Sequence, residues 1–245
     1  MQSSLARFSF WGHDPDCSAI GSCPQKLPPR AAYCDIDGTI TATNILLPLH
    51  WFKRRFSKPL AFYFWQCNLL WRAPWWGLLD KIDRSASNRS IYSHYAGLPA
   101  AEAKQLAGLC FKEYFHPRLF PVVVEELAIL RQQGVKIVLV TGGLDFIARP
   151  IAEFLQADLI APALREKDGL FTGALATPPL TGAAKAAALS EHSQAHGIDL
   201  SQSYAFGDAY PDLPMLEAVG NPVAVNPDSR LKRIAQARHW RILKT

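Results

Sequence analysis

The sequence lacks paired cysteines, long apolar runs and internal repeats, and each absence excludes a class of protein. Its five cysteines are scattered, with no Cys-x-x-Cys pair, which argues against a disulfide-built secreted domain and against a zinc knuckle. We therefore expect reduced thiols and a cytoplasmic location. Residues 1–30 contain several prolines and no long apolar stretch, so we expect a disordered leader rather than a secretory signal.

Length and composition favour one folded core domain with a substantial insertion. Hydrophobic residues make up 49% of the 245 residues and charged residues 19%, which supplies a buried core and excludes wholesale disorder. The net charge of +5 is uneven: residues 50–90 contain eight basic and two acidic side chains, and residues 229–245 contain six basic side chains and no acidic one. For the C-terminal run, a solvated helix face and a binding surface are equally open.

Apolar strands alternate with helices along most of the chain, which predicts a parallel sheet covered on both faces. The predicted strands are Ala31–Ile36, Val135–Val140, Ser203–Phe206 and Pro222–Val225. The predicted helices are Pro121–Gln133, Leu144–Leu155 and Ala183–His196. Ligands of such sheets bind beyond the carboxyl ends of the strands, where the sequence places Asp35, Asp37, Thr141 and Asp208.

This alternation is interrupted between Thr41 and Pro117, where aromatic-rich helical patterns replace the strands. We predict a Rossmann-like α/β core made of residues 31–41 and 118–245, with a helical cap, residues 42–117, inserted after the first strand. A second, shorter insertion is predicted at residues 164–175, where Lys167-Asp168-Gly169 is typical of a hairpin turn.

Asp35 and Asp37 are the most informative side chains because they follow the first strand as Asp35-x-Asp37-Gly-Thr. A carboxylate attacks an anionic phosphate ester only when a cation neutralises the repulsion, and a divalent ion held by Asp35 and the Asp37 main-chain carbonyl would do so. The Asp37 carboxyl would protonate the leaving oxygen and then activate water. An ordinary acidic turn after a strand is the alternative.

Further along the chain, other residues offer the remaining parts of a phosphate site. Thr141 is followed by two glycines at a helix start, so its hydroxyl and nearby N–H groups can bind phosphoryl oxygens, while the spacing excludes a G-x-G-x-x-G dinucleotide turn. Lys185 is the only charge between Thr181 and Ser190, although a helical lysine alone is more typical of a surface. Asp208 and Asp212 add carboxylates that suit magnesium.

Four segments in order resemble the motifs of the haloacid dehalogenase-like (HAD) superfamily, subfamily IB, the phosphoserine-phosphatase-like group. They are Asp35-Ile-Asp37-Gly-Thr-Ile, Leu139-Val-Thr141-Gly-Gly, Lys185 and Gly207-Asp208-Ala-Tyr-Pro-Asp212. The resemblance covers about residues 31–244 and implies a Mg²⁺-dependent phosphatase with Asp35 as nucleophile and Asp37 as acid and base. It also implies phosphate binding by Thr141, Gly142 and Lys185, metal binding by Asp35, Asp37 and Asp208, and a supporting role for Asp212.

Asn44 departs from that subfamily. Phosphoserine phosphatases of this group carry a glutamate nine positions after the nucleophile, which recognises the substrate amino group, and this chain has Asn44 there. Without that carboxylate an ammonium group would lose its partner in a partly desolvated pocket, so phosphoserine is disfavoured as the substrate.

The cap region mixes aromatic and basic side chains, and its tryptophans are Trp51, Trp65, Trp71, Trp75 and Trp76. Residues 60–79 have the length of a membrane span but contain Gln66, Asn68, Arg72 and Pro74, which disfavours a transmembrane helix. Tryptophan among Lys and Arg suits a helix lying in the headgroup layer of an anionic bilayer, and an ordinary aromatic core is the alternative. No nucleic-acid-binding fold or motif is recognisable, so we expect no nucleic acid partner.

The favoured hypothesis is therefore a phosphomonoesterase, with phospholipid phosphates such as phosphatidylglycerophosphate as a substrate class implied by resemblance. A soluble metabolite phosphatase and a non-catalytic membrane-binding module are the alternatives. The cap adds peripheral membrane attachment to the expected cytoplasmic location. His192-x-x-x-His196 has the spacing of a helical metal pair, but no third ligand is near in sequence, which predicts a solvent-facing pair.

Overall fold

The computed structural model describes residues 29–245, apart from the side chains of Ala73 and residues 76–82. Most of the predicted leader, up to residue 28, lies outside the described residues, as do Cys17, Cys23 and the side chain of Trp76. The other three cysteines, Cys34, Cys67 and Cys110, are free thiols, as expected.

Strands and helices alternate through most of the described chain. The strands are β1 (Ala31–Cys34), β2 (Lys136–Val140), β3 (Asp158–Ile160), β4 (Leu164–Lys167), β5 (Leu170–Leu175), β6 (Tyr204–Gly207), β7 (Asn221–Val225) and β8 (Arg241–Leu243). The α-helices are α1 (Leu46–Phe56), α2 (Pro59–Ile82), α3 (Arg84–Tyr92), α4 (Ala100–Cys110), α5 (Pro121–Gln132), α6 (Asp145–Leu155), α7 (Ala183–His196), α8 (Leu213–Glu217) and α9 (Ser229–Ala237). Shorter turns are the π-helical η2 (Phe111–Phe115) and the 3₁₀ helices η1 (Ser93–Tyr95), η3 (His116–Arg118), η4 (Leu200–Gln202) and η5 (Tyr210–Asp212).

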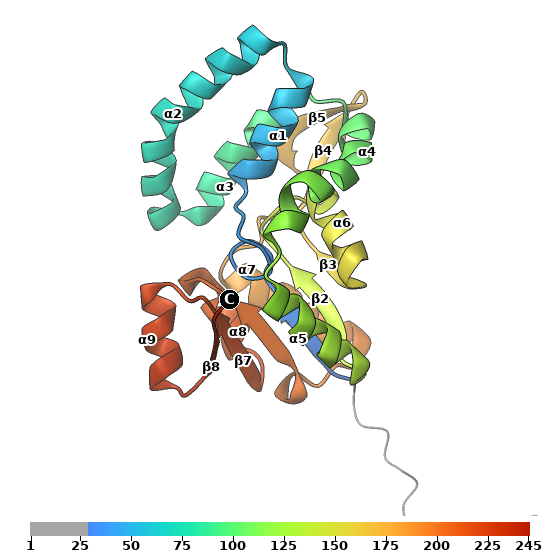
Figure 1. Ribbon diagram of the computed structural model, residues 1–245, viewed down its shortest axis with the longest axis vertical. Coiled ribbons are helices and arrows are strands. Elements are labelled where there is room, and N and C mark those ends of the chain that lie inside the picture. Colours follow the sequence, from blue (N-terminus) through green and yellow to red (C-terminus); the bar gives the residue numbers. More distant parts are fainter. Residues whose placement is uncertain (1–28) are drawn as a thin grey trace, which may run out of the picture.

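One parallel sheet forms the centre of the core, in the order β3-β2-β1-β6-β7-β8 (Figure 1). Side chains of β1 alternate between two apolar clusters, because successive residues of a strand point to opposite faces. Ala32 and Cys34 join the cluster that contains α5 and α6, whereas Ala31 and Tyr33 join the cluster that contains α7, α8 and α9. The predicted α/β fold with a helical insertion after the first strand is confirmed, while the residue limits of core and cap stay a prediction.

The helices α1 to α4 stand above the carboxyl edge of the sheet (Figure 1). The chain enters and leaves this region side by side, through a stalk made of residues 40–42 and 118–120. Within the stalk, the Ala42 N–H donates to the Arg118 carbonyl at 2.9 Å, and the Phe120 N–H donates to the Ile40 carbonyl at 2.8 Å.

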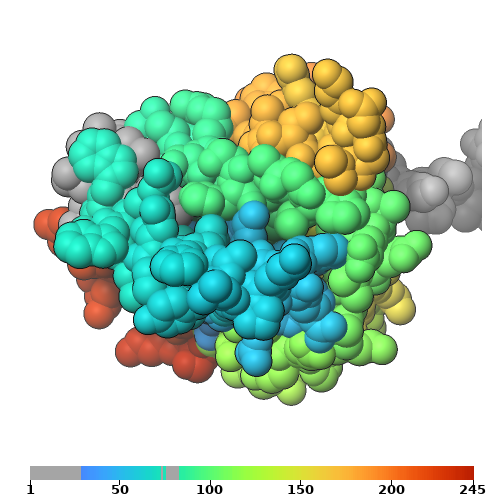
Figure 2. Space-filling view, turned by 90° about the horizontal axis from the view of Figure 1, so that it is seen from above, coloured from blue at the N-terminus to red at the C-terminus, as the bar shows by residue number. Residues whose placement is uncertain are grey.

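The predicted hairpin is confirmed as β4 and β5, which pair antiparallel around Asp168 and Gly169 with φ angles of 51° and 77°. It packs beside the cap helices: the Ala100 N–H of α4 donates to the Gly169 carbonyl at 2.9 Å. Figure 2 shows this hairpin next to α4 and across the upper face from α2. The two predicted insertions, the helical cap and the hairpin, therefore pack side by side.

The edge strands β3 and β8 were not predicted from the sequence. Each has only three residues and starts with a charged side chain, Asp158 or Arg241, so neither forms a continuous apolar run. The basic residues of α9 are exposed, which agrees with a solvated helix face. Within the described part of the chain, no helix combines the length and the apolar character that crossing a bilayer requires.

Candidate active site

The site starts at Asp35, which directly follows the buried strand β1. The residue is only 6% exposed, and its main-chain N–H donates to the Phe206 carbonyl of β6 at 3.0 Å. The parallel pairing of β1 with β6 thus fixes the position of the Asp35 main chain at the carboxyl edge of the sheet. It also brings Asp35 beside the residues that follow β6.

Lys185 reaches this point from the first turn of α7. Its Nζ donates to Asp35 Oδ1 and to Asp212 Oδ1, each at 2.6 Å, and the side chain is almost fully buried. Burial alone would lower the pKa of Lys185, but the charges of Asp212 and Asp35 outweigh it and raise the pKa. The lysine is a permanent cation in the core of the site, not the surface side chain that a helical lysine usually is.

Asp208 and Asp212 follow β6 and face the same place. Carboxylate oxygens of Asp35, Asp208 and Asp212 all lie within 4.8 Å of one another. Thr39 Oγ1 donates to Asp208 Oδ1 at 3.0 Å, which anchors that side chain to the loop after β1. Gly38, with φ 83°, packs so closely that a Cβ there would lie 2.3 Å from Asp208 Oδ2.

This carboxylate cluster carries more negative charge than Lys185 neutralises. Burial raises the pKa of Asp35 to about 7 despite Lys185, and burial together with Asp212 raises the pKa of Asp208 to about 6. Burial disfavours the charged forms of these carboxylates, and a divalent cation bound among them would favour those forms. Oxygen ligands are the ones that Mg²⁺ prefers, so the donor set fits that ion.

Asp37 lies beside the cluster but is held by its own partners. Its Oδ1 accepts a hydrogen bond from Thr43 Oγ1 at 2.7 Å, and Thr43 in turn shares a short hydrogen bond with Thr41. Burial raises the pKa of Asp37, and the hydrogen bond from Thr43 opposes this only in part. The Asp37 carboxyl therefore keeps a proton more readily than an exposed aspartate.

Thr141 and Gly142 follow β2 at the same edge of the sheet. Thr141 is buried, and its Oγ1 accepts a hydrogen bond from the Gly143 N–H at 2.9 Å. The Gly142 carbonyl accepts a short hydrogen bond from the Tyr92 hydroxyl of α3. This contact joins the cap to the phosphate-binding turn that the sequence predicted.

One cavity of about 310 Å³ receives these side chains, and most residues with predicted roles line it: Asp35, Asp37, Thr141, Gly142, Lys185 and Asp212. Asp208 does not line the cavity, but its carboxylate lies within 4.8 Å of the carboxylates of Asp35 and Asp212, which do. The structure thus brings together every residue predicted for the site.

The wall of the cavity toward the cap was not predicted, because its polar residues Arg84, Ser87 and Asn88 belong to no recognisable motif. The only sequence signal was a short polar stretch within an aromatic region.

A family model described as haloacid dehalogenase-like hydrolase matches residues 32–217, which is most of the chain. The protein belongs to this family. The resemblance seen in the four motifs is thereby confirmed, and so is the expectation of an enzyme.

Several relatives of this hydrolase are known. An "inhibition of morphological differentiation protein" of Streptomyces azureus is 33% identical over 243 residues, covering 89% of this chain and 79% of that protein. A probable phosphatase of Mycobacterium tuberculosis is 31% identical over 247 residues, covering 93% and 82%. A solved phosphoserine phosphatase, described as a phospho-aspartyl intermediate analogue, is 20% identical with a TM-score of 0.63, covering 89% and 93%, and shows that the fold is shared.

Proposed function

We propose that this HAD-like hydrolase is a Mg²⁺-dependent phosphomonoesterase that forms a phospho-aspartate on Asp35. The observation that carries the proposal is the convergence of Asp35, Asp37 and Lys185 on one cavity, with Lys185 Nζ 2.6 Å from Asp35 Oδ1. Lys185 holds the Asp35 carboxylate in place and offers its charge to the phosphoryl group that arrives there. The probable phosphatase among the relatives supports the same chemistry.

Two displacements at phosphorus follow from this arrangement. An Asp35 carboxylate oxygen attacks phosphorus while the bond to the ester oxygen breaks, and Asp37 gives its proton to that leaving oxygen. Asp37 then takes a proton from water as the water oxygen attacks phosphorus, which frees inorganic phosphate and restores Asp35. The raised pKa of Asp37 suits the first of these proton transfers.

Thr141 and the turn after it would hold the phosphoryl oxygens. The Thr141 oxygen already accepts the Gly143 N–H, so its hydroxyl hydrogen is left to donate to phosphate. We assign Asp35, Asp208 and the Asp37 main-chain carbonyl as the magnesium ligands, with Asp212 as support. Mg²⁺, when bound, would offset the repulsion between the Asp35 carboxylate and an anionic ester.

A phosphate-release assay with Asp35→Asn tests the chemistry. We expect this variant to lose at least about a thousandfold in kcat/KM, as other enzymes do when their nucleophile is removed. Asp168→Asn is the matched control, because it makes the same change in the β4–β5 turn at a residue with φ 51°, which Asn tolerates. If neither wild type nor either variant cleaves any phosphate ester with Mg²⁺ present, the non-catalytic alternative is favoured.

For the substrate, we propose a phosphate monoester of a phospholipid, for example phosphatidylglycerophosphate. Asn44 lines the cavity, but its Oδ1 accepts the N–H groups of Leu46 and Leu47 at 3.0 and 3.3 Å, so it caps α1. Among the described residues that line the cavity, the carboxylates are those of Asp35, Asp37 and Asp212, which leaves none for an ammonium group. Arg84 at the cap wall instead favours a second anionic group.

The outer face of α2 supports a lipid surface as the place of action. Its exposed large apolar residues are Leu60, Tyr63, Phe64, Leu70, Trp71 and Trp75, which are 61–87% exposed. At 100° per residue they fall within about 140° of the helix circumference. Phe62, Trp65 and Leu69 lie on the opposite side and are partly buried. A helix that is apolar on both sides, with basic residues nearby, fits the headgroup layer of an anionic bilayer.

Vesicle flotation tests the lipid proposal separately from the chemistry. We expect wild type to float with anionic vesicles, and a Phe64→Ser/Trp71→Ser variant to stay behind while it still cleaves a soluble phosphate ester. Val122→Ser/Ile129→Ser is the matched control, because these two residues of α5 are 42% and 50% exposed but lie outside the cap. Equal flotation of all three proteins would contradict binding through the α2 face, and no flotation of wild type would contradict membrane binding altogether.

A soluble metabolite phosphatase is the second candidate, and the fold shared with phosphoserine phosphatase favours it. In that case the α2 face would have no part in turnover. Comparing phosphatidylglycerophosphate and lysophosphatidate with soluble sugar and amino-acid phosphates in one release screen separates the two candidates. A clear preference for a soluble ester would refute the lipid proposal and leave the Asp35 chemistry standing.

A further inference from the structure

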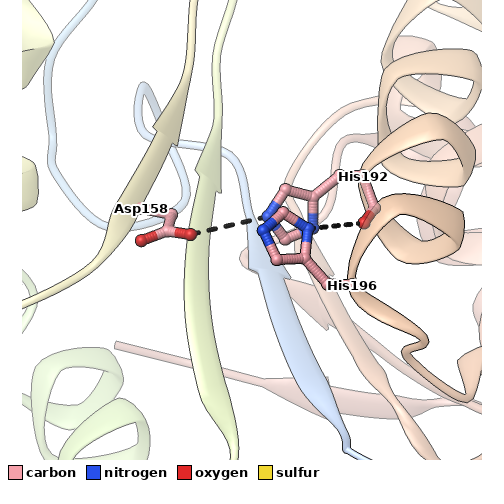
Figure 3. A group of neighbouring side chains, drawn as sticks. All are labelled: Asp158, His192 and His196. Carbon is pink, nitrogen blue, oxygen red and sulfur yellow. Dashed lines mark hydrogen bonds and ion pairs between the residues drawn. The ribbon is translucent and has the colours of Figure 1, made fainter.

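A second group of metal-type ligands lies at the edge strand β3, in a cleft that shares no lining residue with the active-site cavity. Asp158 is the first residue of β3, whereas the active-site residues follow the ends of their strands. His192 and His196 lie one helical turn apart near the end of α7. Figure 3 shows both rings turning a nitrogen toward the Asp158 carboxylate.

The spacing of the three side chains suits one ion. One ligand atom from each of them lies within 4.8 Å of the other two, and His192 Nε2 is 3.5 Å from Asp158 Oδ2. Ligands at about 2.1 Å from a tetrahedral Zn²⁺ are about 3.4 Å apart, which is close to that separation. At 3.5 Å the histidine and aspartate do not form a good hydrogen bond with each other.

Both imidazoles are oriented through their Nδ1 atoms, which leaves Nε2 for a ligand. His196 Nδ1 lies 2.9 Å from the His192 carbonyl, and His192 Nδ1 lies 3.2 Å from the Tyr33 hydroxyl of β1. The His192 side chain is 11% exposed, and its buried Nε2 has no hydrogen-bond partner among the described residues. A buried ring nitrogen without a partner is costly unless something binds it.

The surroundings of the cluster include side chains of both charges. Glu153 of α6 lines the same cleft and adds an anionic side chain near the cluster, while Arg149 adds a cation. Lys136 Nζ is 2.6 Å from Asp158 Oδ2 and would compete with an ion for that oxygen.

We propose that Asp158, His192 and His196 form a binding site for a divalent transition metal of the zinc type. The imidazole nitrogens select such a metal over Mg²⁺, which favours the all-oxygen set at the active site. The bound ion would tie the end of α7 to the edge strand β3. The sequence-based prediction that the histidine pair faces solvent is therefore wrong for His192. The third ligand was not visible because Asp158 is distant in sequence and comes near only through the packing of α7 beside β3.

Zinc titration of the full chain tests this site, with excess Mg²⁺ present to occupy the active-site carboxylates. We expect one bound Zn²⁺ that raises Tm. His196→Gln should weaken Zn²⁺ binding by more than about 10- to 100-fold, which is the loss in metal affinity when only a hydrogen-bond partner of a ligand is removed. His239→Asn is the matched control, because His239 is exposed, has φ 56° and lies outside the cluster. Equal zinc affinity and equal Tm shift in wild type, His196→Gln and His239→Asn would overturn the proposal.

Two further substitutions separate a metal site from a simple cluster of polar groups. Tyr33→Phe keeps the buried ring but removes the hydroxyl at His192 Nδ1, and should weaken Zn²⁺ binding about tenfold. Lys136→Met should strengthen it, because the competing ammonium is gone. Co²⁺ bound in place of Zn²⁺ should show the visible bands of nitrogen and oxygen ligands. Thiolate charge-transfer bands that persist in His196→Gln would place the ion on cysteines instead and would contradict the assignment.

Discussion

Gly38→Ala is the sharpest test of the catalytic geometry, because it changes one methyl group against a proposed metal ligand. The new Cβ would lie 2.3 Å from Asp208 Oδ2, and an ordinary contact needs at least 3.4 Å. The carboxylate must therefore move by about 1 Å, and misplacement of that size can cost about 100-fold in rate. The hydrogen bond from Thr39 Oγ1 to Asp208 would be disrupted at the same time.

The stability cost of Gly38→Ala has two parts. An alanine at φ 83° costs about 1–2 kcal/mol of backbone strain, and loss of the hydrogen bond to the Asp208 carboxylate costs about 1.5–3 kcal/mol. The free energy of unfolding should therefore fall by about 2.5–5 kcal/mol. At about 2–4 °C per kcal/mol for a chain of this size, Tm should fall by roughly 5–20 °C.

Gly134→Ala separates backbone strain from the contact with Asp208. Gly134 has φ 77°, and a Cβ there meets nothing within 4 Å. The Gly134→Ala variant should lose only about 1–2 kcal/mol of stability, because of backbone strain, and should keep full activity. Urea unfolding and phosphate release in a Mg²⁺ titration measure both effects. If the two variants lose equal stability and both keep wild-type activity, the close approach of Gly38 to Asp208 has no catalytic meaning and the reasoning fails.

Three further predictions concern the charges of the site. Lys185→Met should lower the free energy of unfolding by about 3–5 kcal/mol and abolish turnover, because it strands two buried carboxylates, and chemical unfolding with a release assay checks both. In EDTA, the raised pKa values of Asp35 and Asp208 mean that the folded state binds more protons than the unfolded one, so their contribution to stability falls as pH rises from about 4 to 7. Mg²⁺ should flatten this slope in urea melts at pH 5 and 7, and an unchanged slope would refute cation binding there. Asn44→Glu should raise kcat/KM for phosphoserine relative to that for a phosphate ester without an amino group. It should also lower the free energy of unfolding by about 1 kcal/mol, because the α1 cap is lost. No change in the ratio of the two kcat/KM values would show that Asn44 does not face the substrate.

The sequence was sufficient for the core and the catalytic edge because both depend on local patterns. Buried strands such as β1 are continuous apolar runs, and α7 begins and ends where the sequence predicted, with Gly197 at φ 62° closing it. The parallel order of strands then brings Asp35, Thr141 and Asp208 to one edge without any knowledge of distances. Ordered motifs supplied Lys185, which composition alone would have placed on the surface.

The parts that escaped prediction depend on contacts between segments that are distant in sequence. The cap wall at Ser87 and Asn88 is buried only because α3 packs over the turn after β2, where a Cβ on Gly142 would lie 3.3 Å from Asn88 Nδ2. Likewise, Asp158 joins the histidines of α7 through tertiary packing. Neither arrangement leaves a periodicity or a spacing that a reader of the sequence could recognise.

The stalk at residues 40–42 and 118–120 has a consequence for how this enzyme can be altered. Since the outgoing and returning segments already hydrogen-bond to each other at Ala42 and Arg118, their ends sit within reach of a very short linker. The segment between residues 42 and 118 could thus be replaced by another cap without a change in the position of the sheet strands. A different cap grafted onto this core would change which molecules reach the cavity, and it would have to replace Thr43 and Tyr92, which hydrogen-bond to Asp37 and to the Gly142 carbonyl from within the exchanged segment.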